Sequence, residues 1–283
     1  MAAVLTDHTI VELISPEGHR VRISGAKPGT DLGAWLDTSG PDGLGSVEID
    51  EIFDAAARQW GETKVGETMN HGEIDLPIFI LGDSPDDFRR RREHFKTIVR
   101  RHELGWLAIY TNAHGWRWVG VKLGELKPAV PYDPRITRGA KFEMTLIVES
   151  PLARSADYSD SWFNDTGSGK GSVSLYPGPE WEAWPQFVIQ GPGVVTIEYA
   201  GNKVTHMPDA PIKAGEAVLV NTDEARPTVR SSAGRNLWPL MKGQKYRHPI
   251  PPGKVTRVTI TVTGGTTETA VYATCAWRHE GLL

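Results

Sequence analysis

The sequence contains a single cysteine among its 283 residues, so it can form neither an internal disulfide nor a cysteine-based zinc site. It has no run approaching the about 20 apolar residues that a membrane-spanning helix needs, so we expect no membrane insertion. The first residues lack a basic start followed by an apolar stretch, and no signal peptide is therefore predicted. No repeat of fixed period is present.

Neither sign of charge dominates the chain. The 31 basic and 35 acidic residues give a net charge of -4, which argues against a specific nucleic-acid partner. What is abundant is glycine, with 30 residues, and proline, with 20. This composition favours many short strands and turns over a helical bundle. Ten tryptophans are also present.

The signatures of common catalytic sites are absent. Residues 164–172 resemble a phosphate-binding loop, but Asn164 stands where the pattern needs its first glycine, and Gly171 where it needs Ser or Thr. Neither a nucleophile elbow nor an H-E-x-x-H motif occurs. Glu180 and Glu182 would point the same way on one strand, which leaves a glycoside hydrolase only a remote alternative. We predict no catalytic residue, no metal site and no cofactor.

Alternating apolar residues predict strands at Phe142–Val148 and at Ile74–Ile80. Pro77 cannot donate to a ladder, so the second of these strands is expected at a sheet edge or with a bulge. In Val255–Cys275, 13 of 21 residues are β-branched, which predicts two strands around the Gly264-Gly265 turn.

One helix is strongly indicated after Ser84, which can cap it, with Pro85 in its first position. The apolar residues Phe88, Phe95, Ile98 and Val99 would share one face. The run Arg89–Arg92 is interpreted as a solvated helix face, or as ion pairs with a neighbouring subunit, in preference to a phosphate-binding patch. A second, shorter helix is expected around Ile49–Trp60.

The best candidate for a domain boundary follows Ser150. Pro151 comes after a strong strand, and Ser155–Ser174 is rich in Ser, Gly and Asp, so we interpret that segment as a flexible linker. Residues 1–150 are predicted to be an α+β domain with one helix on a sheet, and residues 151–283 an all-β sandwich. The predicted fold class is therefore mainly β.

Five tryptophans form two groups that invite a functional interpretation. Trp106, Trp116 and Trp118 fall within 13 residues, and Trp116 and Trp118 share a strand face opposite Val119 and Val121. Because both faces of this strand are apolar, we expect both to be covered. Either the core covers both faces, or the core covers one face and a subunit interface covers the other. Trp181 and Trp184 lie in a proline-rich turn, where they could stack on sugar rings or plug the end of the sandwich.

Several short motifs follow one another in an order known from one family. In the first half stands GEIDLPIFILG, at 72–82, followed by the predicted helix. The second half contains WPQFVIQGPG at 184–193, VLVNTD at 218–223, IPPG at 250–253 with Val258–Val262 after it, and Trp277-Arg278. In this order, over nearly the whole chain, the sequence resembles the distal tail (Dit) proteins of long-tailed bacteriophages, the siphophage tail-component family. It departs from the family at Asn221 and in the Gly25–Gly45 insertion, whose role is unassigned.

The resemblance implies a structural virion protein and not an enzyme. Members are made in the host cytoplasm and form a homohexameric ring at the distal end of the tail. An N-terminal split-barrel-like domain makes the ring, and a galectin-like C-terminal domain projects outward. The ring would join the tail tube protein to the tail-tip hub protein of the baseplate, around a channel for the tape measure protein and DNA.

With this resemblance, Trp106, Trp116 and Trp118 become candidate subunit-interface residues. The alternative function is a carbohydrate-binding module or virion lectin that contacts host glycans through Trp181 and Trp184.

Overall fold

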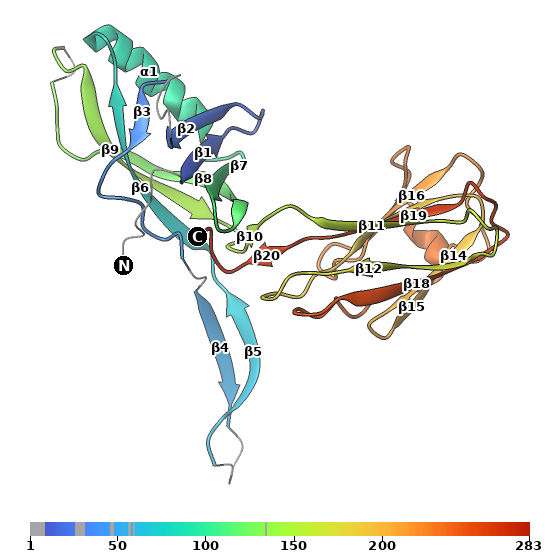
Figure 1. Ribbon diagram of the computed structural model, residues 1–283. Coiled ribbons are helices and arrows are strands. Elements are labelled where there is room, and N and C mark those ends of the chain that lie inside the picture. Colours follow the sequence, from blue (N-terminus) through green and yellow to red (C-terminus); the bar gives the residue numbers. More distant parts are fainter. Residues whose placement is uncertain (1–8, 26–31, 46–47, 56–57, 59, 134) are drawn as a thin grey trace. The chain divides into compact units, whose positions relative to one another are not determined.

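The computed structural model describes residues 9–25, 32–45, 48–55, 58, 60–133 and 135–283 (Figure 1). These residues are mostly β-structure, with one α-helix and one short 3₁₀ helix, η1 (Trp238–Met241). The chain divides into two compact units: unit 1 is Met1–Ser155 with His279–Leu283, and unit 2 is Ala156–Arg278. The predicted fold class, mainly β with an α+β first part and a β-sandwich second part, is confirmed.

The unit boundaries differ from the predicted division at residue 150. Residues 151–155 and the returning segment His279–Leu283 both belong to unit 1. The chain leaves unit 1 after β10 (Ala153–Arg154) and comes back in β20 (Arg278–His279), which pairs with β10. A composition change along the chain cannot reveal such a return. That 1–150 and 151–283 act as separate domains stays a prediction.

Unit 1 is built on an antiparallel sheet in the order β2-β1-β7-β8-β9-β6-β3 that curls into a nearly closed barrel. Its strands are β1 (Ile10–Ile14), β2 (Arg20–Ser24), β3 (Ala34–Leu36), β6 (Gly72–Leu81), β7 (Gly105–Thr111), β8 (Gly115–Pro128) and β9 (Gly139–Val148). Alternate residues of these strands point inward and form the core. Part of the unassigned Gly25–Gly45 segment contributes to it, because Leu32, Ala34 and Leu44 are buried there.

The two strands predicted from alternation are present as β6 and β9, and they pair with each other along their full length. The prediction that Pro77 places its strand at an edge or a bulge is wrong. Strand β6 pairs with β9 without a register shift and with β3 on its other side. The Pro77 carbonyl accepts a hydrogen bond from the Asp37 N–H at 2.8 Å, so its nitrogen also faces the β3 side. Strand β3 is short and ends at Leu36, opposite Ile78, so the ladder needs no N–H donor at Pro77.

The predicted helix is confirmed as α1 (Pro85–Ile98), with Phe88, Phe95 and Ile98 buried in the core of unit 1. The second predicted helix is wrong. Residues Ile49–Asp54 form strand β4, which pairs with β5 (Thr63–Met69), while positions 56–57 and 59 lie outside the described residues. The spacing of Ile49, Ile52 and Phe53 fits a helix, but Thr63–Met69, with three β-branched residues, supplies a strand to pair with.

Unit 2 is a sandwich of two antiparallel sheets, in the orders β11-β19-β13-β16-β17 and β12-β18-β14-β15. Its strands are β11 (Tyr158–Phe163), β12 (Lys170–Leu175), β13 (Gln186–Gln190), β14 (Val194–Tyr199), β15 (Asn202–His206), β16 (Ala217–Asn221), β17 (Thr228–Ser231), β18 (Thr256–Thr263) and β19 (Ala270–Cys275). The two strands predicted around Gly264-Gly265 are β18 and β19, and they lie in different sheets. The inner faces of both sheets form a second core.

The segment interpreted as a flexible linker is ordered structure. It contains β11 and most of β12, each at the edge of one sheet of the sandwich. The turn between them is built on Asn164, which is 1% exposed. Its Oδ1 accepts from the Gly169 N–H at 2.9 Å, and its Nδ2 donates to the Thr266 carbonyl at 2.8 Å. Small polar residues are tolerated here because edge positions face solvent.

Candidate assembly surfaces

Three tryptophans of unit 1, on strands β7 and β8, lie on the outer side of its sheet. Trp116 and Trp118 of β8 are in register with Tyr110 and Ala108 of β7, and Trp106 is opposite Gly120. We call Trp106, Tyr110, Trp116 and Trp118 the aromatic face. Trp116 is 36% exposed and the other three are half-buried. On the opposite side of the same strands, Leu107, Ile109, Val119 and Val121 are buried in the core. In the single chain, core packing on both sides is therefore not observed.

Basic side chains border the aromatic face on strand β2. Glu12 of β1 is opposite Ala108, and its side chain is almost fully buried. Arg22 Nη2 lies 2.9 Å from Glu12 Oε1, and Arg20 Nη1 lies 3.7 Å from Glu12 Oε2. Because two guanidinium groups share one buried carboxylate, this border carries net positive charge.

The hairpin of β4 and β5 is the most exposed element of unit 1. We call residues 48–69 the acidic arm. Within the part of the chain that the structure describes, its strands pair only with each other, and Ile52, Phe53 and Val65 are about half exposed or more. Trp60 is fully exposed.

The acidic arm holds six acidic and two basic residues, so its net charge is -4. The remaining 29 acidic and 29 basic residues of the chain balance. Glu51 stands directly opposite Glu67, and Lys64 Nζ bonds to both carboxylates, at 2.7 and 2.8 Å. Hydrogen bonds to Glu51 and Glu67 raise the pKa of Lys64. This arm was not predicted from the sequence, although its clustered charge is visible there.

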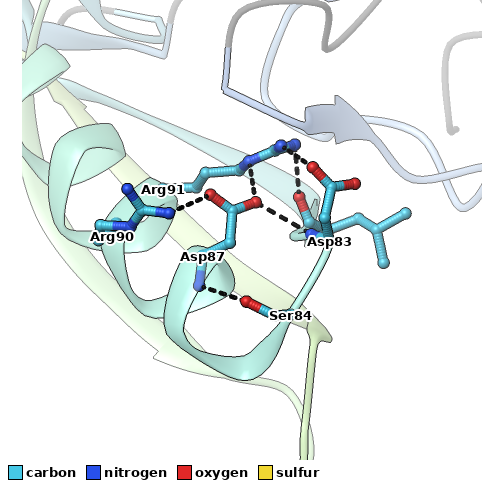
Figure 2. Close-up of polar contacts among 6 residues, drawn as sticks. Asp83, Ser84, Asp87, Arg90 and Arg91 are labelled. Carbon is cyan, nitrogen blue, oxygen red and sulfur yellow. Dashed lines mark hydrogen bonds and ion pairs between the residues drawn. The ribbon is translucent and has the colours of Figure 1, made fainter.

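The arginines of α1 are paired within their own chain. Ser84 Oγ accepts from the Asp87 N–H at 3.1 Å, and Asp87 in turn accepts from the Asp83 N–H at 2.9 Å, which caps the helix (Figure 2). Arg91 contacts Asp87 at 2.7 Å and Asp83 at 2.8 Å, and Arg90 contacts Asp87 at 3.2 Å. The guanidinium groups of these two arginines therefore form ion pairs with the carboxylates near the start of the helix.

The other two arginines of the run are also paired. Arg89 pairs with Asp86, and Arg92 donates to the Tyr132 hydroxyl at 2.7 Å and pairs with Glu93. Hydrogen bonds from Arg92 and Lys96 lower the pKa of Glu93. Pairing with a neighbouring subunit is not needed to explain the four arginines, and a phosphate-binding patch is not supported.

The two tryptophans of the predicted glycan surface are half-buried in unit 2. Trp184 packs against the sandwich core, and Trp181 has its indole Nε1 buried. Between them, Ala183 exchanges two backbone hydrogen bonds with Ile250. This placement favours the plug interpretation, and sugar binding by Trp181 and Trp184 stays a prediction.

Among the described residues, no three His, Cys, Asp or Glu side chains group closely enough to hold a metal ion. No helix of the described part is long and apolar enough to cross a membrane. Cys275 is buried in the core of unit 2, and burial raises the pKa of its thiol to about 12.

Comparison with known proteins gives no match at the level of sequence. No protein-family model matches the chain, and no curated protein matches it.

Solved structures do match, and the three described here come from phages. The crystal structure of the phage SPP1 Dit (gp 19.1) protein, described as a paradigm of the hub adsorption apparatus in phages that infect Gram-positive bacteria, aligns with a TM-score of 0.63 and 12% identity. The alignment covers 89% of this chain and 96% of that one. Chains of the phage P2 baseplate, activated with Ca or with Sr, align with TM-scores of 0.52 and 0.51, identities of 10% and 11%, and coverage of 96% here and 98% there. These similarities show a shared fold over nearly the whole chain.

Proposed function

We propose that this chain is a structural component of a phage tail tip, a distal tail protein with no enzymatic activity. The observation that carries the proposal is the fold shared with the SPP1 Dit protein over 96% of that chain. The order of the short sequence motifs along this chain supports the same assignment independently of the structure.

In this proposal the chain forms a homohexameric ring that joins the tail tube protein to the tail-tip hub protein. The first part of the chain makes the ring, and the galectin-like β-sandwich projects outward. Trp106, Trp116 and Trp118 form part of the subunit contact, since a partly exposed aromatic surface on a single chain is typical of an interface. The tape measure protein and DNA pass through the centre. The assembly takes place in the host cytoplasm and ends in the virion.

The location is tested on virions of the phage that encodes this chain. Antibodies raised against the purified protein, coupled to gold, are applied to intact virions and examined by electron microscopy. We expect gold particles at the end of the tail distal to the capsid. Gold along the whole tail, on the capsid, or absent from the virion contradicts the proposal.

The ring is tested separately by native mass spectrometry of the purified chain, where six copies are expected. A glycan array with the same sample addresses the lectin alternative. No contact among the described residues favours that alternative, and we do not propose it as a second function.

A further inference from the structure

Unit 1 carries two apolar surfaces of different character. The acidic arm presents Ile52, Phe53, Trp60 and Val65, all of them exposed. The aromatic face presents half-buried aromatic rings beside a basic border. The exposed apolar cluster of the arm and the partly exposed rings of the aromatic face are both of the kind that marks interaction sites in soluble proteins. The chain therefore has two surfaces to cover.

The two surfaces are complementary in charge. The arm has a net charge of -4, with Asp54 and Glu62 exposed beside its apolar residues. The border of the aromatic face has Arg20, which is mostly exposed, and Arg22, both sharing the buried Glu12. An acidic arm is attracted to such a border and repelled by a nucleic-acid backbone.

The arm also needs a partner for its own stability. A two-stranded hairpin alone is marginally stable in water. Glu51 and Glu67 face each other across the strands, and Lys64 neutralises only part of their charge. Docking on an aromatic and basic surface would cover the apolar side chains and offset the remaining negative charge.

From these features we infer that the acidic arm of one copy of this chain docks on the aromatic face of the next copy. The inference rests on the proposed ring and names the two surfaces that build it. Because the surfaces differ, the contact is head-to-tail, and contacts of this type close into rings when the rotation between copies permits. A contact between two aromatic faces would instead give a dimer and leave both arms uncovered.

A mixing experiment tests this contact with the full chain. The arm variant carries Phe53→Ser and Trp60→Ser, and the face variant carries Trp116→Ser and Trp118→Ser. Each variant retains one intact surface. We expect each alone to remain monomeric by analytical ultracentrifugation, with at least about tenfold weaker self-association than the unmodified chain. Their mixture should form 1:1 dimers, because the arm of the face variant fits the face of the arm variant.

Four further measurements and variants keep the experiment interpretable. Val188→Ser with Leu219→Ser removes two exposed apolar residues that pair across β13 and β16 of unit 2, and it should assemble like the unmodified chain. Melting curves verify that each variant folds. Should the double face variant unfold, Trp116→Glu replaces it, since this side chain is partly exposed and the carboxylate would repel the arm. Raising the salt concentration should weaken assembly of the unmodified chain.

Other outcomes overturn the inference. An arm variant that still assembles shows that the aromatic face, or another surface, pairs without the arm. A folded mixture that stays monomeric, or an unmodified chain that is monomeric at all accessible concentrations, excludes this contact. Gold labelling at the tail tip combined with an assembling arm variant would retain the proposed function and reject this contact. Head-to-tail dimers in the mixture, combined with no gold labelling at the tail tip, would retain this contact and reject the proposed function.

Discussion

His206 lies in the core of unit 2 with both ring nitrogens bonded. Its Nδ1 is 3.1 Å from the Val195 carbonyl, and its Nε2 is 3.1 Å from the Tyr246 hydroxyl. Since a carbonyl only accepts, Nδ1 carries the proton and Nε2 accepts from Tyr246. Burial lowers the pKa of His206 to about 4. The neutral imidazole is thus part of the core packing.

This histidine makes the stability of unit 2 depend on pH. The unfolded chain binds a proton at its ordinary pKa of about 6.5, while the folded chain does so only near pH 4. Stability is therefore fully present above about pH 6.5 and declines as the pH falls to about 4, by about 3 kcal/mol in total. Urea unfolding at pH values across this window measures the loss.

The matched variants separate His206 from the carboxylates that also titrate in acid. His206→Gln should flatten the pH dependence, while His248→Gln, at an exposed position, should leave it unchanged. Equal slopes for both variants would contradict the role assigned to His206.

Asn164 provides a second prediction at the scale of a residue. Asn164→Ala removes a buried side chain that bonds to Gly169 and Thr266, and it leaves those backbone groups unpaired. We expect a loss of about 2–4 kcal/mol in the free energy of unfolding. Asp165→Ala, at the exposed neighbouring position, should cost less than about 0.5 kcal/mol. Equal, negligible effects would restore the interpretation as a flexible linker.

Among the elements, the returning segment His279–Leu283 contributes to the stability of unit 1. Leu282 is 4% exposed in the core, and its N–H donates to the Leu44 carbonyl at 3.0 Å. Arg117, buried on the inner side of β8, donates to the backbone oxygens of Gly281 and Leu283. This segment thus joins residues at opposite ends of the sequence.

Two adjacent leucines test the contribution of this segment. Leu282→Ala should lower the free energy of unfolding of unit 1 by about 2–4 kcal/mol, because it leaves a cavity in the core. Leu283→Ala, where the side chain is 37% exposed, should cost less than about 1 kcal/mol. Denaturant titrations of the two variants measure the difference. Equal losses would mean that the segment does not pack as described.

How well an element could be predicted from the sequence depended on how locally its cause is encoded. Strands β6 and β9 follow from alternation, and α1 follows from Ser84, Pro85 and a single apolar face. Strand β4 could not be predicted in this way, because its apolar spacing also fits a helix and its partner β5 lies beyond a turn. In strands β11 and β12, half of the positions are Ser, Asp or Gly, and these residues are typical of loops.

The candidate surfaces show the same limit. The alternation of residues in β8 showed a strand that is apolar on both faces, with Trp116 and Trp118 on one of them. Whether other parts of the same chain cover the tryptophan face depends on the tertiary structure. The acidic arm was visible as a cluster of charge, yet its exposure follows only from the absence of a covering element among the described residues of unit 1.

At the scale of the whole molecule, the net charge is concentrated in the acidic arm, and the arginines of α1 are neutralised by nearby carboxylates. A channel through which DNA slides should not bind phosphates, since each basic contact adds salt-dependent affinity. We therefore expect no appreciable binding of duplex DNA by the purified chain at low salt, measured by fluorescence anisotropy. Binding that weakens steeply with salt would indicate a basic channel wall and contradict this expectation.

A cryo-electron microscopy reconstruction of the tail tip in intact virions tests the central claim most directly. The account predicts a ring of six copies at the junction of tail tube and hub, with Trp106, Trp116 and Trp118 of each copy covered by the acidic arm of its neighbour. Arg89–Arg92 should face protein or solvent away from the channel. A ring with solvent-exposed tryptophans, a channel lined by these arginines, or the absence of this chain from the tail tip would contradict it.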